Sequence, residues 1–343
     1  MVDNKLSIKK IFDRLELERD DKFEEFKTTY GLTPSDEMGG TKFAVNFYKS
    51  AVVNYKGNVT GSKDLYSEVI AKTLINDNFI KDWLNLIPAR PDHFKINHPN
   101  TDENVDALKI TNRKEEILAK LLFYQGNVDG LGYIFDYQTP LKATKNDSYG
   151  KIDLLGYNKD DKCYSVIELK YRPSGSEETL LRCVLEAYTY YRLLDIKQIK
   201  SARGHEGIQQ LKKLPGYKHT NEAELVVLFD ERSCAKEDGG AETNLMLRID
   251  PYKPNTPSYP SKTVVSQQYK ECQELINTSK RKELRALCEA ILKQESKLKQ
   301  IRFVVLRIED IDKVVPLKNV QNWSSELDRS YRAETLLTIP SKG

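Results

Sequence analysis

Cysteine and histidine are scarce in this chain, and neither residue type is grouped. No two cysteines form a C-x-x-C pair, and no spacing fits a zinc site. An odd number of scattered thiols fits a reducing compartment better than secretion. Disulfide scaffolds, zinc modules and histidine-based triads are therefore not expected. Five cysteines and four histidines are spread over the 343 residues: Cys163, Cys183, Cys234, Cys272, Cys288, His93, His98, His205 and His219.

Long apolar runs and a large excess of one charge are also missing. No run approaches the ~20 apolar residues that a membrane-spanning helix needs. Residues 1–7 (MVDNKLS) lack the apolar centre of a signal peptide. The 54 Lys and Arg residues against 51 Asp and Glu give a net charge of +3, too mild to indicate a nucleic-acid partner alone. We expect no membrane partner and a cytoplasmic protein.

Two short apolar runs carry charged residues at a spacing that suggests chemistry. The first is 150–156 (GKIDLLG), and the second is 165–170 (SVIELK). Alternate residues of a strand share a face, so Glu168 and Lys170 lie together while Ile167 and Leu169 are buried on the other face. The polar segment 158–162 between the runs predicts an antiparallel hairpin.

The register of this hairpin decides whether the charges meet. If Tyr157 pairs with Tyr164, Asp153 lies opposite Glu168, whereas a slip by one residue turns Asp153 to the far face. Two neighbouring carboxylates repel unless a proton or cation lies between them, and Mg²⁺ prefers such oxygen ligands. The lysine could then polarise an attacking water or a phosphate. The alternative is an acid and a base on an exposed strand face.

The flanking sequence predicts an ordered set of elements. Residues 113–123 form an amphipathic helix pattern that ends near Gly126. A β-rich run at 133–138 follows, and then the hairpin. Residues 177–194 predict a second helix, and 225–229 a further buried strand. The order helix, three strands, helix, strand favours the α/β class, with a central mixed β-sheet flanked by helices.

This order of elements and acids resembles the PD-(D/E)XK nuclease superfamily. The likeness rests on an acid in the first helix, Asp153 in the second strand and Glu168-x-Lys170 in the third. Glu186-x-x-x-Tyr190 in the second helix is similar to the Gln-x-x-x-Tyr signature of the RecB-like branch, with Glu in place of Gln. The resemblance covers residues 112 to about 230 and implies a restriction-endonuclease-like core.

The resemblance also implies a metal centre for Mg²⁺ or Mn²⁺. Asp153 and Glu168 correspond to the metal carboxylates, and the backbone carbonyl of Leu169 to a further ligand. Lys170 corresponds to the lysine that positions the attacking water. Each of these roles is implied only for the residue that stands at the motif position in this chain.

The acid of the first helix and the second-helix motif leave alternatives open. Glu115 has Leu118 and Leu122 at i+3 and i+7 and is preferred as catalytic acid and metal ligand. Adjacent Glu116 is the alternative, as a first-turn acid favoured by the helix dipole. Glu186 and Tyr190 are counted with the catalytic residues, although Glu186 could instead form a surface ion pair with Arg182, four residues earlier.

Positive charge gathers in the segment 196–220, which leaves the second helix. It has six basic residues and one acid, Glu206. We expect this segment beside the metal site, where it would bind DNA phosphates with release of counterions. A solvated basic loop is the alternative. The six residues are Lys197, Lys200, Arg203, Lys212, Lys213 and Lys218.

The rest of the chain is predicted as two flanking parts. Residues 1–100 form a mostly helical N-terminal region, either a separate module or a layer on the core, which could bind a protein partner. Within it, 41–55 could be strand or helix, 63–87 predicts one or two helices, and the proline-rich 88–99 predicts a boundary.

Residues 101–343 form the nuclease-like domain, with its core at about 112–230 and a C-terminal elaboration at 231–343. In that elaboration we expect a strand at 245–249, a long loop at 251–260, helix at 266–300 and a buried strand at 302–308. These elements would add to the central sheet rather than form a new domain.

The combined prediction is a metal-dependent nuclease that hydrolyses phosphodiester bonds, with DNA as substrate. One alternative is a nucleic-acid-binding or assembly module that keeps the fold without catalysis. Another is an interaction scaffold in which the charged trio is coincidental. Metal-dependent cleavage separates the first hypothesis from the other two, and salt-dependent DNA binding separates the second from the third.

Overall fold

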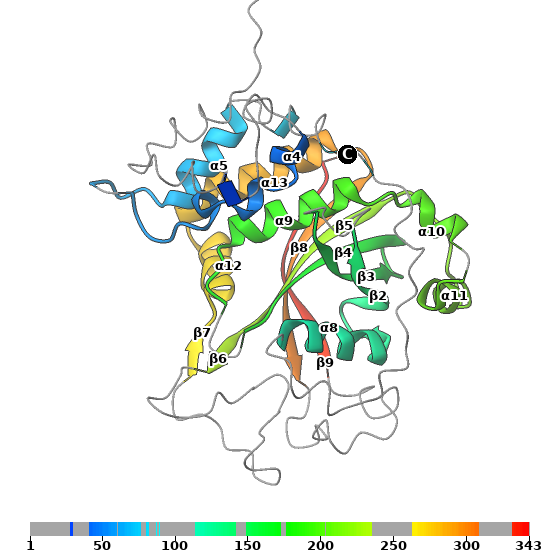
Figure 1. Ribbon diagram of the computed structural model, residues 1–343. Helices are drawn as coiled ribbons and strands as arrows, with labels where there is room; N and C mark the ends of the chain where they lie inside the picture. Colours follow the sequence, from blue (N-terminus) through cyan, green and yellow to red (C-terminus); the bar gives the residue numbers. More distant parts are fainter. Residues whose placement is uncertain are drawn as a thin grey trace, which may run out of the picture.

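The computed structural model is an α/β protein with a seven-stranded mixed β-sheet (Figure 1). The strand order is β1-β2-β3-β4-β5-β8-β9. The strands are β1 (Asn127–Val128), β2 (Gly132–Pro140), β3 (Lys151–Asn158), β4 (Cys163–Lys170), β5 (Ala223–Asp230), β8 (Leu298–Ile308) and β9 (Tyr331–Pro340). The structure describes residues 28–29, 41–59, 61–76, 80–81, 87, 89, 114–141, 149–172, 176–202, 204–234, 263–308 and 331–342.

The centre of the sheet is parallel and its two sides are antiparallel. β4, β5 and β8 run parallel, whereas β2, β3 and β4 form an antiparallel meander and β9 returns antiparallel to β8. Parallel strands need crossover segments, and helices supply them here. The α/β class and the mixed sheet are therefore confirmed.

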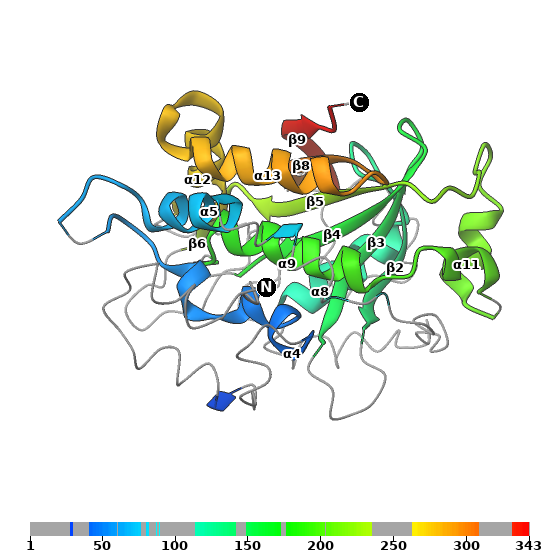
Figure 2. The same ribbon diagram turned by 90° about the horizontal axis from the view of Figure 1, so that it is seen from above.

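Helices cover both faces of the sheet (Figures 1 and 2). α8 (Lys114–Gln125) packs on one face, where Ile117 and Leu121 join Ile167 and Leu169 in one apolar cluster. α9 (Leu180–Leu193), α12 (Gln267–Asn277) and α13 (Lys282–Gln294) pack on the opposite face in a second cluster. Ile167 and Leu169 thus face the buried side, as expected.

The hairpin of β3 and β4 has the predicted register. Tyr157 pairs with Tyr164, and the ladder runs to Leu154, which pairs with Ile167. Continuing this register places Asp153 opposite Glu168. Both strands are buried along almost their whole length, because α8 covers one face and α9 the other. The charged trio therefore does not lie on an exposed strand face.

The described N-terminal residues form a layer beside α9. Residues 41–55, for which strand and helix were both open, form the helical turns α4 (Thr41–Ala44), η1 (Phe47–Lys49) and η2 (Ala51–Asn54). α5 (Tyr66–Asn76) confirms a helix within 63–87. Apolar residues of these elements share one core cluster with α9 and the sheet. The expectations for 1–30 and for 90–100 lie outside the described residues.

The C-terminal part adds to the same sheet. The helix expected over 266–300 is two helices, α12 and α13, with a 3-10 turn η4 (Ser279–Arg281) between them, and β8 already begins at Leu298. β9 was not expected from the sequence. The expected strand at 245–249 and loop at 251–260 lie outside the described residues. A small ribbon of β6 (Arg232–Cys234) and β7 (Thr263–Val265) precedes α12. None of the helices described here is long and apolar enough to cross a membrane.

Candidate active site

The site forms where the ladder between β3 and β4 ends. Beyond Leu154, the backbone N–H of Leu169 donates to Oδ2 of Asp153 at 2.9 Å instead of continuing the ladder. Gln138 of β2 donates from Nε2 to Oδ1 of the same carboxylate at 3.0 Å. Gln138 has a φ of 49°, a conformation that costs a non-glycine residue free energy and is found at functional sites. Asp153 is thus fixed by a neighbouring strand on each side.

Lys170 ends β4 and collects three carboxylates around its ammonium group. Nζ contacts Glu168 on the same strand face, Glu178 before α9 at 2.9 Å and Glu186 within α9 at 3.0 Å. The lysine side chain is only 7% exposed. Burial alone would lower the pKa of Lys170, but the surrounding carboxylates, Glu168 and Glu186 foremost, raise it well above its usual value. Lys170 is therefore a fixed cation at neutral pH.

Glu186 connects Lys170 to the N-terminal layer through a chain of hydrogen bonds. Tyr190, one turn later on α9, donates from its hydroxyl to Oε1 of Glu186 at 3.0 Å. The Tyr190 hydroxyl also lies 3.0 Å from the hydroxyl of Tyr48 in η1. Glu186 is buried and Arg182 pairs with Glu178 instead, so the alternative of a surface pair between Arg182 and Glu186 is wrong.

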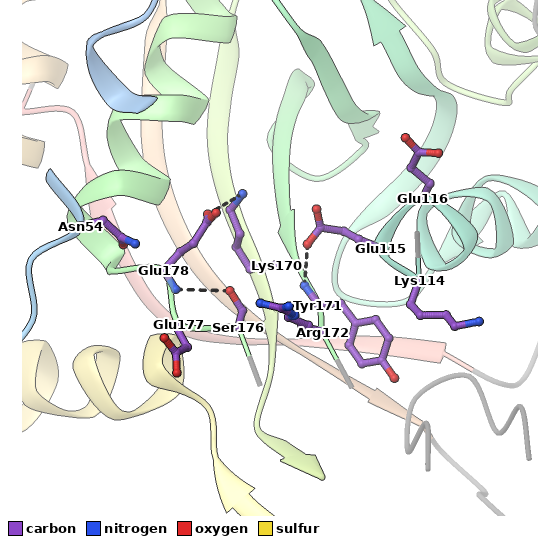
Figure 3. A pocket seen from close by; sticks show the side chains of 10 residues that line it. All are labelled: Asn54, Lys114, Glu115, Glu116, Lys170, Tyr171, Arg172, Ser176, Glu177 and Glu178. Carbon is purple, nitrogen blue, oxygen red and sulfur yellow. Dashed lines mark hydrogen bonds and ion pairs between the residues drawn. The ribbon is translucent and has the colours of Figure 1, made fainter. Parts of the chain in front are cut away.

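The acid of the first helix that reaches the site is Glu115. Its Oε2 accepts the backbone N–H of Tyr171, directly after β4, at 2.8 Å. Burial raises the pKa of Glu115 to about 8, opposed by Lys170 and supported by Asp153. Glu116 points away from this cluster (Figure 3). The geometry thus agrees with the preference for Glu115.

The cluster holds more carboxyl groups than cationic groups. Burial raises the pKa of Asp153 to about 6, opposed by Lys170. Burial, with the charges of Asp153 and Glu186, raises the pKa of Glu168 well above its usual value. The pKa of Glu186 is lowered, because Lys170 and Arg182 outweigh its burial. One ammonium group therefore serves several carboxylates, which would gain from a second cation.

The donor chemistry fits a divalent cation, although Lys170 now supplies the counter-charge. Oε2 of Glu168 is buried and has no hydrogen-bond partner in the part of the chain that the structure describes, and a buried oxygen left in this way is costly. In the same part of the chain, no three His, Cys, Asp or Glu side chains already have the arrangement of a metal site. None of the contacts among the described residues tests whether the backbone carbonyl of Leu169 is a metal ligand, so that role stays a prediction.

A cavity of about 570 Å³ gives access to this cluster (Figure 3). Lys170, Glu115 and Glu178 line it, while Asp153 and Glu168 are buried. Lys114 and Arg172 add positive charge to its lining, and Glu116 and Glu177 add negative charge. A ligand could reach Lys170 from solvent between α8 and the start of α9.

The basic segment does not lie beside the carboxylates. α10 (Lys197–Ser201) and α11 (Glu206–Lys212) follow the far end of α9 (Figure 1). The carbonyl of Lys218 accepts from the hydroxyl of Tyr157 at 3.2 Å, near the start of β4, whereas Lys170 ends that strand roughly 23 Å away at strand spacing. Arg203 lies outside the described residues. The prediction that the basic segment lies beside the metal site is wrong, and DNA binding by this segment stays a prediction.

Three residues of the site were missed from the sequence. Gln138 could have been noticed from its place opposite Asp153 once β2 was paired, and Glu178 from its place just before Thr179, the N-cap of α9. Tyr48 gave no local signal, because it lies 142 residues from Tyr190.

Comparisons of this chain with known protein families, with curated proteins and with solved structures gave no match. The geometry of the site therefore carries the functional argument alone.

Proposed function

We propose that this protein is a nuclease that needs Mg²⁺ or Mn²⁺ and hydrolyses phosphodiester bonds of DNA, with a restriction-endonuclease-like core. One observation carries the proposal. A buried lysine is held by carboxylates of β4 and α9 at the point where the strand carrying Asp153 separates from its partner. Asp, Glu-x-Lys and a helix acid come together there from separate elements, as the PD-(D/E)XK pattern requires.

Asp153, Glu168 and Glu115 would hold the metal ion, because their oxygens are the hard ligands that Mg²⁺ and Mn²⁺ take. A bound ion supplies charge stabilisation at the phosphate and a more acidic water. The pKa of Glu115, raised to about 8, keeps a proton on this carboxyl group at neutral pH when no cation is near, whereas Asp153, with a pKa raised to about 6, keeps its proton only below that pH. Metal binding would then displace protons.

Lys170 would act as a fixed donor and not as a general base. Its pKa lies well above its usual value, so the ammonium group keeps its proton at neutral pH. It can donate hydrogen bonds to the attacking water or to a phosphate oxygen while the new O–P bond forms and the P–O bond to the leaving nucleotide breaks. Glu186 anchors the side chain from α9 at 3.0 Å, and Tyr190 holds Glu186 in turn.

A second candidate is a nucleic-acid-binding or assembly module without catalysis. The observation in its favour is that Lys170 already neutralises Glu168, Glu178 and Glu186. A cluster with its own cation can be a purely structural ion-pair network.

The test is cleavage of supercoiled plasmid and labelled single-stranded DNA with Mg²⁺, with Mn²⁺ and with EDTA, combined with Mn²⁺ binding measured by electron paramagnetic resonance. We expect metal-dependent cleavage by the wild type, and loss of both cleavage and Mn²⁺ binding in Asp153→Asn. Exposed Asp160→Asn in the hairpin turn is the matched control. A wild type that binds DNA but neither cleaves it nor binds Mn²⁺ would favour the second candidate.

A further inference from the structure

A second cavity of about 790 Å³ is lined by described residues of α5, of the segment before it, and of α12, η4 and the start of α13. Its lining is polar and strongly charged, with seven basic and four acidic side chains. The basic residues are Lys56, Lys63, Lys72, Lys270, Lys280, Arg281 and Lys282, and the acidic residues are Asp64, Glu68, Glu274 and Glu283. We call this cavity the basic groove.

Two of the four acids in the groove are used by the fold itself. Glu68 is buried and accepts the backbone N–H groups of Glu283 and Leu284 at 2.7 and 3.2 Å, so it caps the start of α13. Glu274 pairs with the buried Arg281 at 2.9 Å. These carboxylates are therefore poorly placed to neutralise the lysines on the rim.

Four lysines of the groove are available to contact a ligand. Lys63, Lys72, Lys270 and Lys280 are exposed. Among the described residues, none of the ion pairs involves these four ammonium groups. They come from both walls, with Lys63 and Lys72 on the side of α5 and the other two on the side of α12 and η4. A narrow channel with lysines on both walls concentrates positive potential.

An ion pair links the lining of the basic groove to the lining of the active-site cavity. Lys56 of the groove pairs at 2.8 Å with Glu177, which lines the active-site cavity. Asn54, two residues before Lys56, also lines that cavity and accepts the backbone N–H of Thr179 at 2.8 Å. The ion pair at the boundary is exposed on both sides, so it can exchange partners without unfolding anything.

We infer that the basic groove binds the sugar-phosphate backbone of the nucleic acid whose cleavage we propose above, and leads it to Lys170. The inference rests on that proposed function. Among the described residues that line the groove, none is Phe, Tyr, Trp or His, so these residues offer no platform on which bases could stack. Lysine is a point charge suited to phosphate oxygens, and such contacts carry no sequence information. The groove therefore supplies affinity and direction, and the sequence of the bases matters little.

The test compares two triple variants in binding of labelled DNA by fluorescence anisotropy, with EDTA present so that nothing is cleaved. Lys72→Gln, Lys270→Gln and Lys280→Gln together alter the groove. Lys159→Gln, Lys293→Gln and Lys297→Gln together alter exposed lysines outside both the groove and the basic segment, with the same change of charge. Affinity is measured against salt concentration for both variants and the wild type.

We expect the groove variant to lower the slope of log K against log salt by about 2–3, since each lost phosphate contact removes about 0.7–0.9. The control variant should leave the slope unchanged. An unchanged slope in the groove variant overturns the inference, and so does a wild type that binds no nucleic acid at low salt. A control variant that lowers the slope as much as the groove variant does would make the effect one of net charge alone and also overturns the inference.

Hydrolysis of bis(p-nitrophenyl) phosphate separates this inference from the proposed function. Hydrolysis of this small diester requires the metal ion and Lys170, but the molecule is too short to extend from the active site into the groove. If the groove variant loses DNA affinity and cleaves the diester as fast as the wild type, both ideas stand. If the slope falls as expected but neither protein cleaves the diester or DNA with any metal, the groove stands and the nuclease does not.

Discussion

Two buried charged clusters lie at opposite ends of β4 and β5, and they are built on different principles. At one end, Lys170 faces Glu168, Glu178 and Glu186. At the other end, Glu224 of β5 forms a bidentate pair with Arg302 of β8, at 2.7 and 2.9 Å. Ser165 and Gln300 donate to the same carboxylate at 2.7 and 2.6 Å.

The two clusters differ in how completely their charges are matched. Glu224 is fully buried, but each of its oxygens is matched by a donor and its charge by one guanidinium. The Lys170 cluster has surplus carboxylates, raised pKa values and an oxygen of Glu168 without a hydrogen-bond partner among the described residues. A protein keeps such an imbalance only at a cost in stability, and perturbed groups of this kind concentrate at functional sites. The first cluster is expected to hold the sheet together, and the second to bind and react.

The largest expected effect is that of Lys170→Ala on catalysis. The change removes the donor to the reacting water or phosphate, so the cleavage rate should fall about 10²- to 10⁴-fold. DNA affinity should change little, because one lysine is a small share of the phosphate contacts. Lys159→Ala, which alters an exposed lysine in the hairpin turn, is the control. Equal cleavage rates for Lys170→Ala and the wild type would remove Lys170 from the mechanism.

Arg302→Met should lower the free energy of unfolding and leave the cleavage rate of the folded protein unchanged. It leaves the buried charge of Glu224 without its partner, which costs about 3–5 kcal/mol in the free energy of unfolding, measured by urea denaturation. The double variant Arg302→Met, Glu224→Leu should recover most of that loss, because no buried charge remains. A drop in the rate per folded molecule, with stability retained, would contradict the division between the two clusters.

The excess of carboxylates should also make the metal-free protein less stable as pH rises. Glu115 keeps its proton in the folded state up to a pKa of about 8, whereas the unfolded chain loses it near 4.3. Between these values the folded state binds more protons, so the free energy of unfolding falls with increasing pH. Denaturation in EDTA at pH 5.5, 7 and 8.5 measures this slope.

Glu115→Gln should make the dependence of the free energy of unfolding on pH shallower, because it removes one of the groups that titrate. Glu116→Gln, the same substitution one residue along α8, is the matched control and should leave the slope unchanged. Mg²⁺ should stabilise the wild type more at pH 8.5 than at pH 5.5, since it competes with protons for the same oxygens. A metal-free slope of the opposite sign would contradict the raised pKa of Glu115.

The sequence predicted what depends on local pattern. Alternation and the polar turn at 158–162 predicted the hairpin but left its register open, and the structure has the register that places Asp153 opposite Glu168. The location of the basic segment was predicted wrongly, although the sequence indicated a long helix at 177–194 before it. α9 has 14 residues and is about 21 Å long, so the chain leaves it far from Lys170.

Long-range contacts account for most of the remaining differences between the predictions from the sequence and the structure. β9 joins β8 only after a segment outside the described residues, and no local signal fixes that pairing. Gln138 reaches Asp153 through a left-handed backbone conformation that its residue type does not favour. Tyr48 meets Tyr190 because two apolar surfaces pack together.

The smallest expected effect tests how far the reactive cluster extends into the N-terminal layer. Tyr48→Phe removes the hydroxyl that lies 3.0 Å from that of Tyr190, which in turn holds Glu186 and through it Lys170. One hydrogen bond is worth about 1 kcal/mol, so the cleavage rate should fall about fivefold if the whole of it is felt in the transition state. Tyr217→Phe is the control, because it breaks a comparable contact of 2.6 Å with Tyr164 at the other end of β4 and should leave the rate unchanged. If both variants lose only stability and cleave DNA as fast as the wild type, Tyr48 packs against the site without positioning it.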